Sequence, residues 1–215
     1  MTLLMLLATA CMLGFLHALE VDHMLAVSAF VSRRPAVGAA ARFGARWGLG
    51  HSVAVLAAGG VLLALGVRWP ERWDAAGEAV VGAMLVGLGA WAIVSARRMR
   101  RHTEGHERAH AHDHAHEHDH HGITVVGFLH GLAGTSAAVA LVPVTMLDRT
   151  SAGIGYLAAF GIGVTAAMTL FAMVAAAAVR RAADRSDLWG RRAAALVGSA
   201  AIVTGAVWIA RALTP

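Results

Sequence analysis

Six long apolar runs dominate the sequence, and they restrict the chain to a membrane. Hydrophobic residues make up 58% of the 215 residues and charged residues only 14%, whereas charged residues make up about a quarter of a typical soluble domain. An apolar run of about 20 residues is long enough to cross the hydrocarbon core of a lipid bilayer as an α-helix. The sequence therefore predicts an all-α integral membrane protein with six transmembrane helices, over residues 3–31, 43–67, 75–96, 123–147, 152–179 and 193–213.

The first apolar run, residues 3–31, is too long for one straight span. At a rise of 1.5 Å per residue, a helix of this length would measure about 44 Å, against about 30 Å of hydrocarbon. The run also contains two acids, Glu20 and Asp22. We therefore expect this segment to be either long and tilted or broken near the acids.

The distribution of arginine predicts the orientation of the chain. All 18 basic residues are arginine; 14 of them follow the first, third and fifth apolar runs and 4 follow the second, fourth and sixth. Basic residues concentrate on the cytoplasmic side of a membrane. We therefore expect a bacterial plasma (inner) membrane protein with both termini outside and the 97–121 connection in the cytoplasm. Because membrane edges account for the net charge of +5, no nucleic acid partner is expected.

Short motifs recur at a fixed distance along the chain. The stretch Gly14–His17 (GFLH) returns as Gly127–His130, at an offset of 113 residues. The same offset aligns Trp47–Gly50 with Phe160–Gly163, and glycines of the third and sixth runs match at an offset of 116. This regularity predicts an internal duplication.

Each half of the duplication contains three apolar runs. Since three is an odd number, the second half must enter the membrane upside down relative to the first. Inverted repeats of this kind are typical of secondary transporters, which bind their substrate near mid-membrane where the halves meet. We expect a first three-helix repeat over residues 1–99, a histidine-rich cytoplasmic loop over 100–121 and a second three-helix repeat over 122–215.

Ionisable side chains inside the apolar runs form the main candidate site. Such groups cost roughly several kcal/mol in hydrocarbon, so they indicate a function by default. Imidazole and carboxylate together suit Ni(II), Co(II) or Zn(II) better than Mg(II) or Ca(II), which prefer oxygen ligands. The candidate metal ligands are His17, Asp22, His23, His51 and His130, and the secondary candidates are Glu20, Thr135 and Ser136.

The spacing of the candidates in the first run bears on how they converge. Around a straight helix, Asp22 lies about 140° and His23 about 240° from His17. The three side chains would point apart unless the backbone unwinds near residues 18–22 or other helices surround this one. Unwound backbone at this depth is tolerated only where it lines a cavity.

A structural role is the alternative interpretation of each candidate. A buried acid such as Glu20 or Asp22 can stabilise a helix bundle by pairing with an arginine or a histidine. His51 and His130 can equally be buried side chains that only complete hydrogen bonds. The sequence leaves this choice open.

A histidine-rich loop supports the choice of metal. Residues 102–121 hold nine of the 13 histidines and five of the 13 acids. Neutral imidazoles bind divalent transition metals, and the tract has no apolar periodicity, so we expect it to be disordered without metal. Its alternative role is that of a plain spacer. The candidate loop ligands are His102, His106, His110, His112, His114, His116, His118, His120 and His121.

Two of these motifs resemble the nickel/cobalt transporter family, a superfamily that includes urease-associated nickel permeases and nickel/cobalt efflux proteins. The segment His17–His23 (HALEVDH) resembles its H-x4-D-H signature, and His130–Gly134 (HGLAG) is similar to a second-half motif of its six-span members. The resemblance implies that His17, Asp22 and His23 bind the metal. The chain has Glu20-Val21 where the uptake pattern has small and acidic residues, and six runs instead of eight. These departures leave the direction of transport open.

The leading hypothesis is a secondary transporter of Ni(II) and/or Co(II), with the metal as substrate, no catalytic cofactor and no enzymatic activity. The two halves would rock to alternate access, and proton exchange could supply the coupling. The chain contains no phosphate-binding loop motif, so its own use of ATP is not expected. Partners compatible with this hypothesis are a cytoplasmic metallochaperone and a second copy of the chain.

Three other functions remain open at this point. One is export of another divalent ion such as Zn(II), and another is a membrane metal sensor or storage protein. The third is a glycerolipid acyltransferase, because His17-x4-Asp22 also matches the His/Asp spacing of those enzymes. Such enzymes carry a sizeable cytosolic domain, for which this chain has no room.

Overall fold

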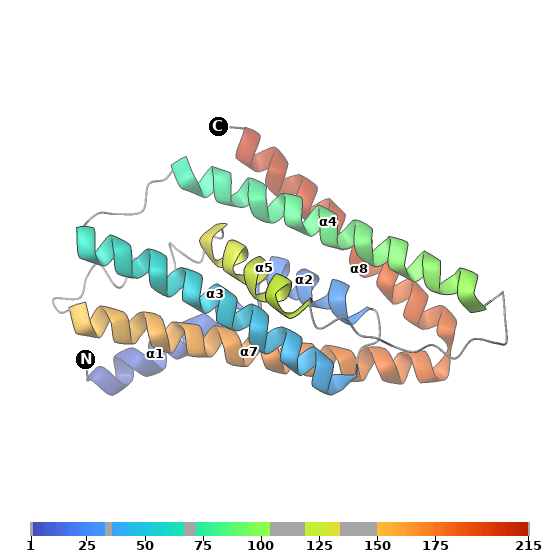
Figure 1. Cartoon of the computed structure of the whole chain (residues 1–215), viewed down its shortest axis with the longest axis horizontal. Coiled ribbons are helices and arrows are strands. Elements are labelled where there is room, and N and C mark those ends of the chain that lie inside the picture. The colour runs from blue at the N-terminus through green and yellow to red at the C-terminus, as the bar shows by residue number, and fades with distance from the viewer. Residues whose placement is uncertain (1, 33–35, 67–71, 104–118, 134–149, 215) are drawn as a thin grey trace.

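The computed structural model describes residues 2–32, 36–66, 72–103, 119–133 and 150–214, and helices account for almost all of them (Figure 1). This arrangement confirms the predicted all-helical membrane architecture. The helices of the described residues are α1 (Leu3–His17), α2 (Val21–Val31), α3 (Val37–Leu65), α4 (Arg72–Thr103), α5 (Asp119–Ala133), α7 (Thr150–Arg185) and α8 (Asp187–Leu213).

Four of these helices, α3, α4, α7 and α8, are each long and apolar enough to cross a membrane. The pair α1 and α2 passes the same test together, with a bend that is typical of a broken span or of a re-entrant loop. The described apolar part of α5, Ile123–Ala133, is shorter. The predicted fourth span, 123–147, continues into residues outside the described ranges, so the count of six spans stays a prediction.

The first apolar run is broken, as one of the two expectations for it required. Helices α1 and α2 meet at an angle of 58°. The backbone N–H groups of Leu19 and Glu20 close a tight turn by donating to the carbonyls of Leu16 and His17, both at 3.0 Å. Glu20 itself is extended, with ψ of 156°, and α2 begins at the next residue. The break puts His17 at the end of one helix and His23 in the first turn of another.

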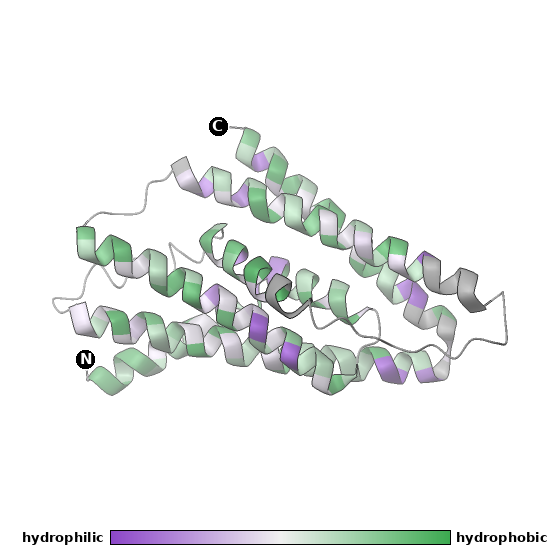
Figure 2. Ribbon diagram, in the orientation of Figure 1, coloured by the Kyte–Doolittle hydropathy of each residue, from purple (hydrophilic) through white to green (hydrophobic). Residues whose placement is uncertain are grey.

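Two long helix pairs form the frame of the molecule. Helix α3 lies along α7, and α4 lies along α8, while α2 and α5 lie between the pairs (Figure 1). The helices are apolar over most of their length (Figure 2). Large apolar side chains are exposed on every long helix, as lipid contact requires; examples are Leu65, Val94, Ile162 and Leu196.

Glycines allow the close helix contacts. Where two backbones touch, a Cβ on the glycine would collide with a backbone atom of the facing helix, and small residues are typical of such membrane interfaces. These contacts occur in pairs related by the offset of 113. The matched backbone contacts are Gly14 on Phe160 with Gly127 on Trp47, and Gly50 on Thr124 with Gly163 on Cys11. A third pair matches Gly48 on Thr165 with Gly161 on Ser52, where Gly161 faces the serine side chain.

The α4–α8 pair has its own matched glycine contacts. Gly82 and Gly205 each lie against the other's carbonyl, and so do Gly89 and Gly198. An offset of 116 carries Gly82 to Gly198 and Gly89 to Gly205, so it exchanges the two contacts. These glycine contacts therefore follow the offsets found in the sequence.

We predict that Gly50→Ala destabilises the protein by about 1–3 kcal/mol, since the new methyl group would press on the Thr124 carbonyl of α5. The matched control is Gly60→Ala in the same helix, where nothing lies within 4 Å of an added Cβ. That change should be neutral or stabilising by up to about 1 kcal/mol, because alanine favours a helix. Thermal unfolding in detergent measures both, and an equal change in Tm would contradict the packing argument.

Candidate metal centre

All five primary candidates meet in the interior of the helix bundle. The whole-residue exposures are 3% for His17, 2% for Asp22, 1% for His23, 0% for His51 and 1% for His130. These residues come from α1, α2, α3 and α5, and so from both halves of the chain. The structure therefore brings all five candidates together.

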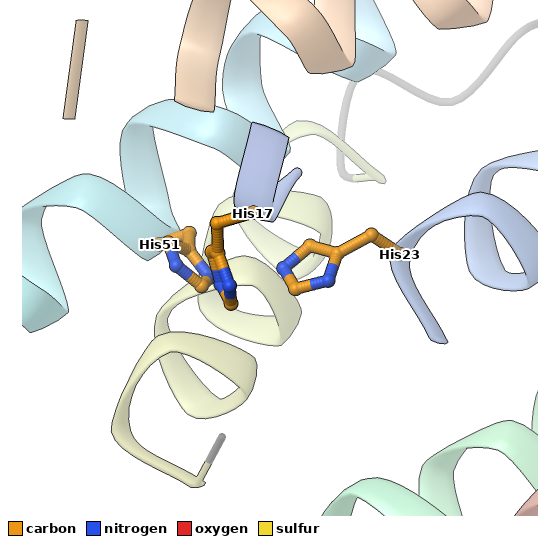
Figure 3. Close-up of side chains that lie close together, drawn as sticks. All are labelled: His17, His23 and His51. Carbon is orange, nitrogen blue, oxygen red and sulfur yellow. The ribbon is translucent and has the colours of Figure 1, made fainter. Parts of the chain in front are cut away.

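The break in the first span lets the first-half residues converge. His17 is the last residue of α1, while Asp22 and His23 lie in the first turn of α2. Figure 3 shows His17, His23 and His51 approaching one another from three separate helices. A straight helix would have pointed His17 and His23 about 120° apart.

The four imidazole rings form a closed arrangement. The ring centroid of His17 lies 4.7 Å from that of His23 and 5.5 Å from that of His51. On the other side, His130 lies 4.3 Å from His23 and 5.9 Å from His51. The central rings, His23 and His51, are 5.2 Å apart. His23 and His51 therefore contact each other and both outer histidines.

Asp22 holds two of these histidines. Its Oδ1 lies 3.0 Å from Nδ1 of His23, and its Oδ2 lies 2.8 Å from Nε2 of His130. A carboxylate oxygen only accepts, so both imidazoles donate and their tautomers are fixed. The lone pair of His23 is then on Nε2 and that of His130 on Nδ1.

Glu20 orients the remaining outer histidine. Nδ1 of His17 donates to Oε1 of Glu20 at 2.9 Å, which leaves the lone pair of His17 on Nε2. The His17 side chain is 2% exposed, whereas the Glu20 side chain is 41% exposed. Glu20 therefore contacts the centre from its edge.

Each histidine keeps at least one nitrogen without a hydrogen-bond partner among the described residues. Buried polar atoms are hydrogen-bonded in the large majority of cases, so this grouping points to a missing ligand. The unpartnered ring atoms are Nε2 of His17, Nε2 of His23, Nδ1 of His130 and both nitrogens of His51.

Two overlapping groups have the spacing that a metal ion requires. His17, His23 and His51 each offer a nitrogen within 4.8 Å of the other two, and Asp22, His23 and His130 do the same with one ligand atom each. Nitrogens around a tetrahedral ion with bonds of about 2.0 Å are about 3.3 Å apart. A small inward movement of the side chains would complete the first group, whereas the second group would first have to release the hydrogen bonds of Asp22. These are the groups of this kind within the described residues.

The hydrogen bonds refine the predicted role of Asp22. Metal-binding histidines usually donate their second N–H to a carboxylate or a carbonyl, which fixes the ring and raises its basicity. Asp22 is in that position for His23, and Glu20 is in that position for His17. Both Asp22 oxygens point to imidazoles, so the structure presents it first as a positioning residue.

Some candidates fall outside what the structure describes. Thr135 and Ser136 lie outside the described residues, as do the loop histidines at positions 106, 110, 112, 114, 116 and 118. His102 belongs to α4, and His120 and His121 belong to α5. The loop's role as a metal-binding segment stays a prediction.

Two aromatic residues of the site were missed in the sequence. The ring of Phe160 lies 5.7 Å from that of His17, and the ring of Trp47 lies 5.8 Å from that of His130. The signal was present, because the offset of 113 that pairs the two histidines also pairs Trp47 with Phe160. Each outer histidine thus lies against an aromatic ring of the other half.

We predict that Asp22→Asn weakens binding of Co(II) or Ni(II) by about 10- to 100-fold, the usual effect of losing a group that orients a ligand. An amide can satisfy both histidines only if one of them changes its tautomer. Titration calorimetry with the nine loop histidines replaced by glutamine measures this affinity. Unchanged affinity would exclude a role for the Asp22 charge at the centre.

The chain is similar to a curated protein, the urease accessory protein UreH from Bacillus sp. (strain TB-90). The two sequences are 32% identical over 174 residues, which cover 79% of this chain and 75% of that protein. No protein-family model matches the chain. No solved structure matches it significantly.

Proposed function

The chain belongs to the family of the urease accessory protein UreH, and from this premise we propose that it transports divalent transition-metal ions across a membrane. A urease accessory protein is named for the enzyme that it serves. The membership thus confirms the expectation that this chain is not itself an enzyme. It also agrees with the resemblance to urease-associated nickel permeases, which favours Ni(II), with Co(II) as the second substrate.

The observation that carries this proposal is the group of unpartnered imidazole nitrogens deep in an apolar bundle. His17, His23 and His51 have unpartnered ring nitrogens, one nitrogen of each lies within 4.8 Å of the others, and carboxylates orient two of the three rings. Three neutral imidazoles suit a borderline ion such as Ni(II), Co(II) or Zn(II). A helix bundle that needed only stability would fill this space with apolar side chains.

The paired glycine contacts support the second part of the proposal, which is that two inverted halves surround the ion. The contact of Gly14 with Phe160 is the counterpart of the contact of Gly127 with Trp47. His17 and His130, the counterparts of each other, both lie in the centre. Rocking of two such halves about this centre would expose the ion first to one side of the membrane and then to the other.

The arginine distribution supports an orientation with the 97–121 connection in the cytoplasm. The C-terminal ends of α4 and α7 lie at one end of the long axis, opposite the N-terminal end of α1 (Figure 1). The histidine-rich loop would then collect or deliver ions at the inner mouth. A cytoplasmic metallochaperone is the partner that such a loop would meet.

Ion flux into proteoliposomes tests the proposal. With a metal-quenched dye inside, we expect saturable entry of Ni(II) or Co(II), and loss of that entry in His17→Ala and in Asp22→Asn. Tyr156→Phe is the control, since its buried hydroxyl has no partner among the described residues and lies outside both ligand groups. Absence of flux for all ions in folded protein would refute transport, and entry of Zn(II) alone would identify the alternative substrate.

Replacement of the nine loop histidines by glutamine should reduce the number of ions bound per chain while preserving saturable flux. The reason is that the loop carries no residue of either buried group. Metal analysis after dialysis measures the bound ions, and the proteoliposome assay measures the flux. If flux were abolished and the buried centre still bound metal, the loop would be part of the pathway, contrary to this expectation.

A further inference from the structure

We propose that the buried centre offers the ion two alternative positions on either side of His23, one completed by His17 and one by His130. The first position consists of His17, His23 and His51, and the second of Asp22, His23 and His130. This inference rests on the proposed transport function. It adds a second binding position and a reason why the ion moves between the two.

The geometry of His23 separates the two positions. Its Nδ1 faces Asp22 at 3.0 Å, while its Nε2 has no partner among the described residues. The two nitrogens of an imidazole point in different directions, so each can serve one position. The second carboxylate oxygen of Asp22, Oδ2, lies 2.8 Å from Nε2 of His130. The ring centroids of His130 and His23 are 4.3 Å apart.

The two positions exclude each other because a neutral imidazole has one lone pair. With the proton of His23 on Nδ1, its lone pair is on Nε2 and only the first position is complete. Binding at the second position needs the proton on Nε2 and the lone pair on Nδ1, and His130 must likewise hold its proton on Nδ1. The number of protons on each ring is the same in both states.

The internal offset relates the two histidines that complete the two positions. His17 and His130 are equivalent residues at the offset of 113, and each lies against an aromatic ring of the other half, Phe160 or Trp47. His23 and His51 have no histidine counterparts, because Ser136 and Val164 stand at those places. His23, the ligand common to both positions, thus comes from the first half, and each of the two equivalent histidines completes one position.

The ligand sets of the two positions also differ in charge. In the first position all three ligands are neutral imidazoles, and the carboxylates of Asp22 and Glu20 reach the ion only through His23 and His17. In the second position the Asp22 carboxylate compensates one unit of the ion's double positive charge, which matters in an interior of low dielectric constant. We therefore expect the second position to bind more tightly once its hydrogen bonds are released.

Co(II) binding to single variants tests the proposal. The protein is the full-length chain with the nine loop histidines changed to glutamine, and the ion is Co(II), whose visible spectrum reports its ligands. We expect one ion per chain in the parent, and still one ion in His17→Ala and in His130→Ala, with different spectra. His17→Ala combined with His130→Ala should bind none, and Tyr156→Phe should behave as the parent.

Asp22→Asn distinguishes the two positions. Combined with His17→Ala it should abolish binding, because Asp22 is then a ligand of the position that remains. Combined with His130→Ala it should weaken binding by about 10- to 100-fold, because Asp22 then only orients His23. His17→Gln, which keeps a side chain of similar length, replaces His17→Ala if the alanine variant does not fold.

Several outcomes would overturn the inference without touching the proposed function. They are two ions bound per parent chain, no ion in His17→Ala, or identical spectra in the two single variants while the parent still transports. Both single variants should lose flux although each binds an ion, since each has lost one of the two positions. Flux at the parental rate in His130→Ala would also overturn the inference. Failure of the parent itself to transport would instead refute the proposed function.

Discussion

The two hydrogen bonds of Asp22 are the interaction on which the centre depends. This carboxylate is almost fully buried, and one oxygen binds a histidine of its own helix while the other binds a histidine of α5. A charge in an apolar bundle is tolerated only when it is paired in this way. The pairing therefore fixes the distance between α2 and α5, and it fixes which nitrogens remain for a ligand.

The break in the first span makes that interaction geometrically possible. Free backbone groups at this depth need partners, and the turn between α1 and α2 supplies them through its own carbonyls. The bend of 58° turns the start of α2 toward α5. This bend thus brings His17, Asp22 and His23, which lie within seven positions of the sequence, into one buried site from two different helices.

The sequence predicted the helices and the members of the site better than their roles. The apolar runs located the long helices, but α3 begins before its run and α7 extends beyond its run at both ends, since alanine and arginine are good helix formers. The length of the first run and its two acids predicted either a tilted helix or a break near the acids, and the histidines inside apolar runs predicted the candidate ligands. That Asp22 would bind His130 depends on the angle of the break and on helix packing, which no local pattern contains.

The matched glycine contacts have a consequence for how such a chain can diversify. In the contacts of Gly14, Gly50, Gly127 and Gly163, one half supplies the glycine and the other half supplies the carbonyl that lies against it, and the counterpart contact reverses these parts. A change of spacing in one half would therefore disturb two interfaces at once. The centre has no such constraint, because Val164 and Ser136 already differ from His51 and His23. The glycines that set the helix packing and the histidines of the centre thus occupy separate positions, so a new ion preference can arise at the centre while the helix packing is unchanged.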